Sequence, residues 1–61
     1  MELSALKVGQ KVLVRGWDGV ATWGQVDGVY EDIKNDTPGI DWTTDGGDTR
    51  WAYLDQVEKV R

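Results

Sequence analysis

The chain contains no cysteine and no histidine, and it has a single proline. These absences exclude disulfide bonds, zinc sites with Cys or His ligands, and catalysis by a Cys nucleophile or a His base. At 61 residues the chain has the length of one domain with a small core. We therefore predict a single domain over residues 1–61, with a core region of about 6–60 and no cofactor or metal.

Long apolar runs are also missing. No stretch has the roughly 18 apolar residues that a membrane-spanning helix requires, and residues 1–6 (MELSAL) lack the features of a signal peptide. The absence of cysteine suits a reducing compartment. We expect a cytoplasmic protein (or a nuclear one, if its source is eukaryotic) without a membrane partner.

Basic residues are few, since seven Lys and Arg stand against eleven Asp and Glu, for a net charge of −4. Between Asp27 and Asp48 seven acidic residues are opposed only by Lys34. This sector can attract a cationic partner, although Asp residues also serve simply as polar turn formers. Phosphate backbones are bound by clustered Lys and Arg, so the composition disfavours a nucleic-acid ligand.

What the chain does have is eight glycines and several Asp and Asn residues between short apolar runs, a pattern typical of all-β proteins. The predicted strands cover residues 11–15, 21–31, 39–43, 49–54 and 57–60, with a polar loop over 32–38 and turns at 45–48 and 55–56. Gly24 and Gly28 inside the second strand predict a bulge or sharp bend. Five such strands favour one strongly bent sheet curled into a small barrel, which hides its edges.

Alternation within the strands predicts the core. Ile40 and Trp42 share one face of the third strand by period two. The predicted core consists of Leu6, Val8, Val12, Val14, Val26, Ile40, Leu54 and Val57, with parts of the aromatic side chains.

The order of these features resembles the Tudor-type branch of SH3-like barrels. Residues 6–15 (LKVGQKVLVR) resemble the family's opening and first strand. WDG at 17–19 and WGQV at 23–26 resemble its Asp-Gly turn and second strand. Residues 40–46 (IDWTTDG) and 51–57 (WAYLDQV) resemble its third strand and its closing segment. The resemblance implies a five-stranded SH3-like barrel over about residues 6–60.

Tudor-type domains that read protein tails hold a methylated Lys or Arg in an aromatic cage through cation–π attraction. The resemblance carries Trp42 onto one cage position and Trp17 close to another, and Trp51 or Tyr53 can supply a third. The second strand departs from the pattern: Thr22 stands where a cage aromatic is expected, with Trp23 on the opposite face of that strand.

Four tryptophans exceed what so small a core can bury, and Trp is enriched at interfaces. We therefore predict a non-catalytic binding module for a protein or peptide with basic, possibly methylated, Lys or Arg residues. Its predicted surface combines aromatic and acidic side chains, namely Trp17, Trp42, Trp51, Tyr53, Asp41, Asp45 and Asp48.

Three alternatives remain open. WGQV at 23–26 with Gly28 and Tyr30 resembles the second strand of plasmid-type II dihydrofolate reductases, but their pore sequence Val-Gln-Ile-Tyr is matched here only by Tyr53, so we do not expect an enzyme. A nucleic-acid-binding accessory domain would have a small basic face of Lys7, Lys11, Arg15 and Lys59. A homo-oligomer would bury the exposed tryptophans against a second copy.

Overall fold

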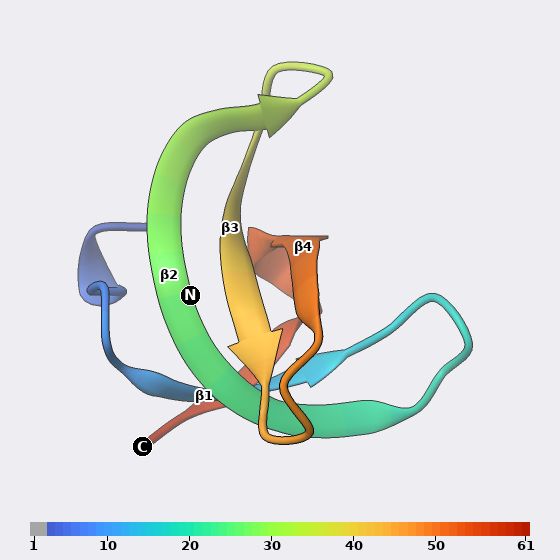
Figure 1. Cartoon of the computed structure of the whole chain (residues 1–61). Helices are drawn as coiled ribbons and strands as arrows, with labels where there is room; N and C mark the ends of the chain where they lie inside the picture. Colours follow the sequence, from blue (N-terminus) through green and yellow to red (C-terminus); the bar gives the residue numbers. More distant parts are fainter. Residues whose placement is uncertain (1–2) are drawn as a thin grey trace.

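Five antiparallel strands form a single sheet in the computed structural model of this protein, which describes residues 3–61 (Figure 1). The all-β class is confirmed, while Met1 and Glu2 of the predicted domain lie outside the described residues. The elements in chain order are η1 (Leu3–Ala5), β1 (Lys11–Arg15), β2 (Ala21–Lys34), β3 (Thr37–Thr44), β4 (Thr49–Tyr53), η2 (Leu54–Gln56) and β5 (Val57–Val60), where η denotes a 3-10 helix.

The sheet is strongly curved but not closed. Its strand order is β4-β3-β2-β1-β5, and β2 bends through the molecule so that it pairs with β1 near its start and with β3 beyond (Figure 1). The prediction that curling hides the edges is therefore wrong for β4 and β5, which are the two edge strands within residues 3–61. The short helix η2 connects these two strands along the chain. The open side of the sheet, between β4 and β5, is thus crossed by η2 and not by strand-to-strand hydrogen bonds.

Glycines allow the bend of β2, as the sequence predicts. The register against β3 shifts between Val26 and Gly28, which marks a bulge. Gly24 meets a different need, because a Cβ there would lie 2.4 Å from Cε3 of Trp42 and 2.5 Å from the carbonyl oxygen of Thr43. The second strand thus requires glycine where the Trp42 ring lies directly on its backbone.

We expect Gly24→Ala to destabilise the protein by about 1–3 kcal/mol, because the added methyl group overpacks the contact with Trp42. Gly46→Ala is the matched control, since its nearest neighbour would lie 3.7 Å away and its backbone does not require glycine. That control should change stability by less than about 0.5 kcal/mol. Urea unfolding of both variants measures the difference, and equal effects would show that the Trp42–Gly24 contact is unimportant.

A tight hairpin replaces the predicted loop over residues 32–38, and the loop prediction is wrong. Strand β2 continues to Lys34, which pairs with Thr37 of β3 across Asn35 and Asp36. Both turn residues have φ of 56°, as a type I′ turn requires. Glu31, Asp32 and Lys34 can be polar within a strand because this end of the hairpin is largely exposed.

Asp36→Gly should stabilise the protein by about 0.5–1 kcal/mol, because glycine adopts a positive φ without a Cβ penalty. The turn's hydrogen bond from the Asp36 N–H to Oδ1 of Asp32 (3.0 Å) involves the backbone and survives the change. Asp36→Ala removes the same carboxylate but keeps a Cβ, so it should give no stabilisation. A similar gain in Tm for both variants would attribute the effect to charge instead of backbone conformation.

The core lies on the inner face of the sheet. Seven of the eight predicted core residues are buried there, namely Leu6, Val12, Val14, Val26, Ile40, Leu54 and Val57. Val8 is the error, with 67% of its surface exposed, because it lies in the turn that precedes β1. Trp42 and Ala52 complete the core with exposures of 2% and 1%.

Candidate functional site

Three aromatic side chains form a cluster beside the edge strand β4. Trp51 and Tyr53 project from β4, and Trp17 reaches them from the loop over residues 16–20. Their ring centroids lie 6.0 Å (Trp17–Trp51), 5.6 Å (Trp17–Tyr53) and 5.1 Å (Trp51–Tyr53) apart, each pair edge to face. Trp17 remains 70% exposed and Trp51 37% exposed, so this aromatic cluster forms part of the surface.

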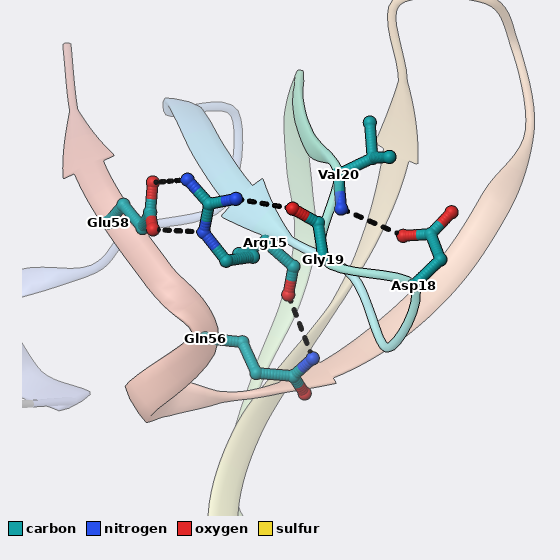
Figure 2. A network of polar contacts seen from close by, with 6 residues as sticks. All are labelled: Arg15, Asp18, Gly19, Val20, Gln56 and Glu58. Atoms are coloured by element: carbon teal, nitrogen blue, oxygen red, sulfur yellow. Dashed lines mark hydrogen bonds and ion pairs between the residues drawn. The ribbon is translucent and has the colours of Figure 1, made fainter.

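The loop that carries Trp17 is ordered by its own hydrogen bonds. The Gly16 N–H donates to the carbonyl of Val20 (2.9 Å), and the Val20 N–H donates to Oδ1 of Asp18 (3.0 Å). Gly19 has a φ of 83°, which suits the predicted Asp-Gly turn. Figure 2 shows Arg15 reaching this loop, where its Nη1 donates to the Gly19 carbonyl.

Arg15 also ties the loop to β5. Its Nε lies 2.5 Å from Oε1 of Glu58, and its Nη2 donates to Oε2 (3.1 Å), which makes a two-pronged contact (Figure 2). Gln56 bridges the open side of the sheet, because its Nε2 donates to the Arg15 carbonyl (2.9 Å) and its Oε1 accepts from the Tyr53 N–H (2.8 Å). The loop that carries Trp17 is therefore fixed beside β4 by the contact of Arg15 with β5 and by the hydrogen bonds of Gln56.

The Arg15–Glu58 contact makes stability depend on pH. The hydrogen bond from Arg15 lowers the pKa of Glu58 below its ordinary value of 4.5. A lowered pKa in the folded state stabilises the protein above the unfolded-state pKa, and this contribution is lost as the pH falls through the lowered value.

We therefore expect Glu58→Gln to flatten the acid part of the stability profile. Between about pH 5 and about pH 3, its Tm should fall less than the Tm of the unsubstituted protein. Thermal unfolding followed by circular dichroism provides the two profiles. Parallel profiles would mean that the contact with Arg15 does not shift the titration of Glu58.

A cleft runs along the open side of the sheet, between the Trp17 loop and β4. Its volume is about 340 Å³. We call it the seam cleft, and its walls include Trp17, Asp18, Trp42, Arg50, Trp51 and Gln56.

Trp42 is not the exposed contact residue that the family resemblance predicts. Its side chain is only 2% exposed and packs in the core against Gly24, because it shares the inner face of β3 with Ile40. It contributes to the surface only as part of the lining of the seam cleft. Among residues 3–61, its Nε1 has no hydrogen-bond acceptor.

Asp41 lies on the outer face, beside the aromatic cluster. It is the cross-strand partner of Trp51, and its Oδ2 accepts a hydrogen bond from the Tyr30 hydroxyl (3.0 Å). This hydrogen bond, with the negative charge of Asp41, raises the pKa of Tyr30. Oδ1 of Asp41 is buried and has no partner among residues 3–61.

A shallow groove extends from Asp41 over the same face. We call it the sheet-face groove; its volume is about 470 Å³ and it is lined by Tyr30, Ile33, Lys34, Asp41 and Trp51. Within it, the Lys34 ammonium nitrogen lies 5.2 Å from the ring centroid of Trp51, a cation–π distance.

The other two predicted acids lie at the β3–β4 turn, outside the aromatic cluster. Asp45 is 2.5 Å from the ammonium of Lys11 on β1. Asp48 is 3.7 Å from the guanidinium of Arg50, which lines the seam cleft. The predicted surface is thus divided. Trp17, Trp51, Tyr53 and Asp41 lie together, whereas Asp45 pairs with Lys11 and Asp48 lies near Arg50.

Sequence reasoning missed Asp18, Tyr30, Lys34, Arg50 and Gln56 as site residues. The sequence pattern could have indicated Arg50, because period two places it with Ala52 on the face of β4 opposite to Trp51, which is the face that Trp42 shares. Lys34 and Gln56 gave no such signal, since their contacts depend on the missed hairpin and on η2.

Comparison with known proteins does not extend this description: no family model matches the chain, and neither a curated protein nor a solved structure matches it. No helix within residues 3–61 is long and apolar enough to cross a membrane. Fold and site together define a small all-β domain with an aromatic cluster between two hollows of its surface.

Proposed function

We propose that this protein is a non-catalytic binding module of the SH3-like, Tudor-like type, which holds a Lys or Arg side chain of a protein partner in its sheet-face groove. One observation carries the proposal: the chain's own Lys34 places its ammonium 5.2 Å from the centroid of the Trp51 ring. A partner's cation would take this place, and Lys34 would move aside into solvent.

Charge in the groove supports a cationic ligand. Asp41 is the cross-strand partner of Trp51 and lines the same groove, and its Oδ1 has no donor among residues 3–61. A buried carboxylate oxygen is stabilised by a donor, and a guanidinium or ammonium group supplies one. The net charge of −4 favours the approach of such a partner over longer distances.

Methylation of the ligand is not needed for this mode of binding. In the aromatic cluster the rings contact one another at centroid distances of 5.1–6.0 Å, so they do not surround a cation as a cage does. The cation would instead bind to one face of Trp51. A trimethyl-lysine peptide should therefore bind no more tightly than its unmodified form.

Substitution of Lys34 tests the proposal. Lys34→Gln removes the internal competitor and should strengthen binding of a lysine peptide about two- to fivefold, as a cation–π contact of about 0.5–1 kcal/mol implies. Lys7→Gln makes the same change of charge at an exposed position away from the groove. Tryptophan fluorescence titrations of both variants give the affinities, with a glutamine-for-lysine peptide as the ligand control.

Equal strengthening in the two variants would show that the effect comes from net charge alone. The Lys34–Trp51 contact would then no longer support cation binding in the groove. Equal binding of the glutamine-for-lysine peptide would contradict a cationic ligand altogether.

A homo-oligomer is the second candidate, favoured by one observation. Trp17 and Val20 are 70% and 58% exposed on the same loop, next to the edge strand β4. Burial of such a patch against a second copy would stabilise the fold. Sedimentation equilibrium over a hundredfold range of concentration distinguishes this candidate, since a monomer throughout would exclude it.

A nucleic-acid ligand has less support. Of the basic face considered from the sequence, Lys11 contacts Asp45 and Arg15 contacts Glu58, so two of its four cations already have carboxylate partners.

A further inference from the structure

The seam cleft is distinguished from the sheet-face groove by the polar groups that line it. Gln56 is engaged at both ends of its amide, with the Tyr53 N–H and the Arg15 carbonyl. Asp18 is held by the Val20 N–H. Trp42 and Arg50 also line the cleft, and their side-chain donors lack a hydrogen-bond acceptor within residues 3–61.

The indole N–H of Trp42 is the stronger of these two observations. The side chain is 2% exposed, and a buried donor without an acceptor costs free energy unless a ligand or water pairs with it. Its Cε3 edge lies on Gly24 of β2, on one side of β3. The opposite edge of an indole carries Nε1, so Nε1 lies on the side of the ring away from Gly24, and Trp42 lines the seam cleft.

Arg50 brings a cation to the same place. It is the cross-strand partner of Trp42, and paired residues on one face of a sheet have Cβ atoms about 4.5–5.5 Å apart. Its guanidinium lies 3.7 Å from Asp48, beyond hydrogen-bond distance, and remains half exposed. Trp42 and Arg50 therefore present their donors from neighbouring positions on one face of the sheet.

The remaining walls of the cleft are aromatic. Trp17 and Trp51, with ring centroids 6.0 Å apart, contribute apolar surface at its mouth. A volume of about 340 Å³ accommodates a small organic group.

We propose that the seam cleft is a second binding site, for a carboxylate or carbonyl group carried on a flat apolar body, whose oxygen accepts hydrogen bonds from Trp42 Nε1 and Arg50. A small aromatic acid and the C-terminal carboxylate of a peptide that ends in an aromatic residue share this chemistry. The site does not depend on the proposed cation binding, because its polar contacts come from different residues.

Proton–nitrogen NMR spectra of the labelled protein test this site with four probes: benzoate, benzamide, N-acetylphenylalanine and benzylammonium. Trp42→Phe, which removes the N–H, assigns the Trp42 indole signal; if that variant does not fold, contacts of the indole with Gly24 assign it instead. Benzoate should shift the Trp42 signal downfield in a saturable manner, and benzylammonium should leave it in place.

Arg50→Gln should weaken benzoate binding about tenfold, whereas Arg61→Gln, with the same change of charge beside Trp23, should not. Tighter binding of benzoate than of benzamide supports a carboxylate ligand, and equal binding supports a carbonyl. Tighter binding of N-acetylphenylalanine than of benzoate supports a peptide C-terminus as the source, and the reverse supports a small aromatic acid.

Three results would overturn the proposal: a Trp42 signal that stays in place while those of Trp17 and Trp51 move, an equal response to benzylammonium, or equal weakening by the two arginine substitutions. None of these results excludes a cation in the sheet-face groove, because Trp42 and Arg50 do not line it.

Discussion

Replacement of Trp42 by alanine is expected to lower the free energy of unfolding by about 3–5 kcal/mol. The indole is 2% exposed and contacts the backbone at Gly24, so its loss leaves a cavity at the centre of the sheet. A chain of 61 residues has a total stability of about 3–9 kcal/mol, and the variant should be largely unfolded at room temperature.

Trp42→Phe is the control for this prediction, because it retains an apolar ring and should cost less than about half as much. Urea unfolding followed by far-ultraviolet circular dichroism measures both variants. A change below about 1 kcal/mol for Trp42→Ala would mean that the indole is not a core residue.

Removal of Trp51 should affect binding strongly and stability only slightly, in contrast to removal of Trp42. Trp51→Ala is expected to weaken binding of a lysine peptide about thirtyfold, which is the size of an interface hot spot. Stability should fall by only about 1–2 kcal/mol, because the ring is 37% exposed and loses mainly its edge contacts with Trp17 and Tyr53.

Trp23→Ala provides the matched control for Trp51→Ala. Trp23 is a tryptophan of the same sheet, but it lies outside the aromatic cluster. The guanidinium carbon of Arg61 is 5.7 Å from the centroid of its ring. Its loss should leave affinity within about twofold of the unsubstituted protein, as expected outside a hot spot. Similar losses of affinity in the two variants would show that binding depends on general stability and not on the aromatic cluster.

The sequence predicts much of the fold because strand alternation and turn residues are local signals. The bounds of β1 and β5 agree with the prediction, and the bulge occurs at Gly28. The hairpin at Asn35–Asp36 was missed because Asn-Asp is a weaker turn signal than Asn-Gly, and because its flanking residues are polar. Open edges at β4 and β5 follow from long-range pairing, which no local pattern reveals.

Trp42 shows how a resemblance can mislead. Period two already places it with Ile40, a predicted core residue, and the structure confirms that both are buried. The cage position suggested by the Tudor-type pattern pointed to the surface instead.

The acidic residues show a different limit of sequence reasoning. Asp45 lies near the cluster in sequence, but its carboxylate contacts Lys11, which is 34 positions away. Asp41, by contrast, joins Trp51 through the register of β3 with β4. Such partners depend on which strands become neighbours, so the sequence predicted candidates and the fold selected among them.

The most direct test of cation binding is a titration of the labelled protein with a lysine peptide, followed through the four indole N–H signals at two protein concentrations. If the sheet-face groove binds a cation, the Trp51 and Trp17 signals should shift and saturate, the Trp23 signal should stay in place, and a glutamine-for-lysine peptide should have no effect. Shifts that follow dilution alone would identify the aromatic cluster as a self-association surface. Shifts confined to Trp23, or none at all with the lysine peptide, would contradict cation binding in the sheet-face groove.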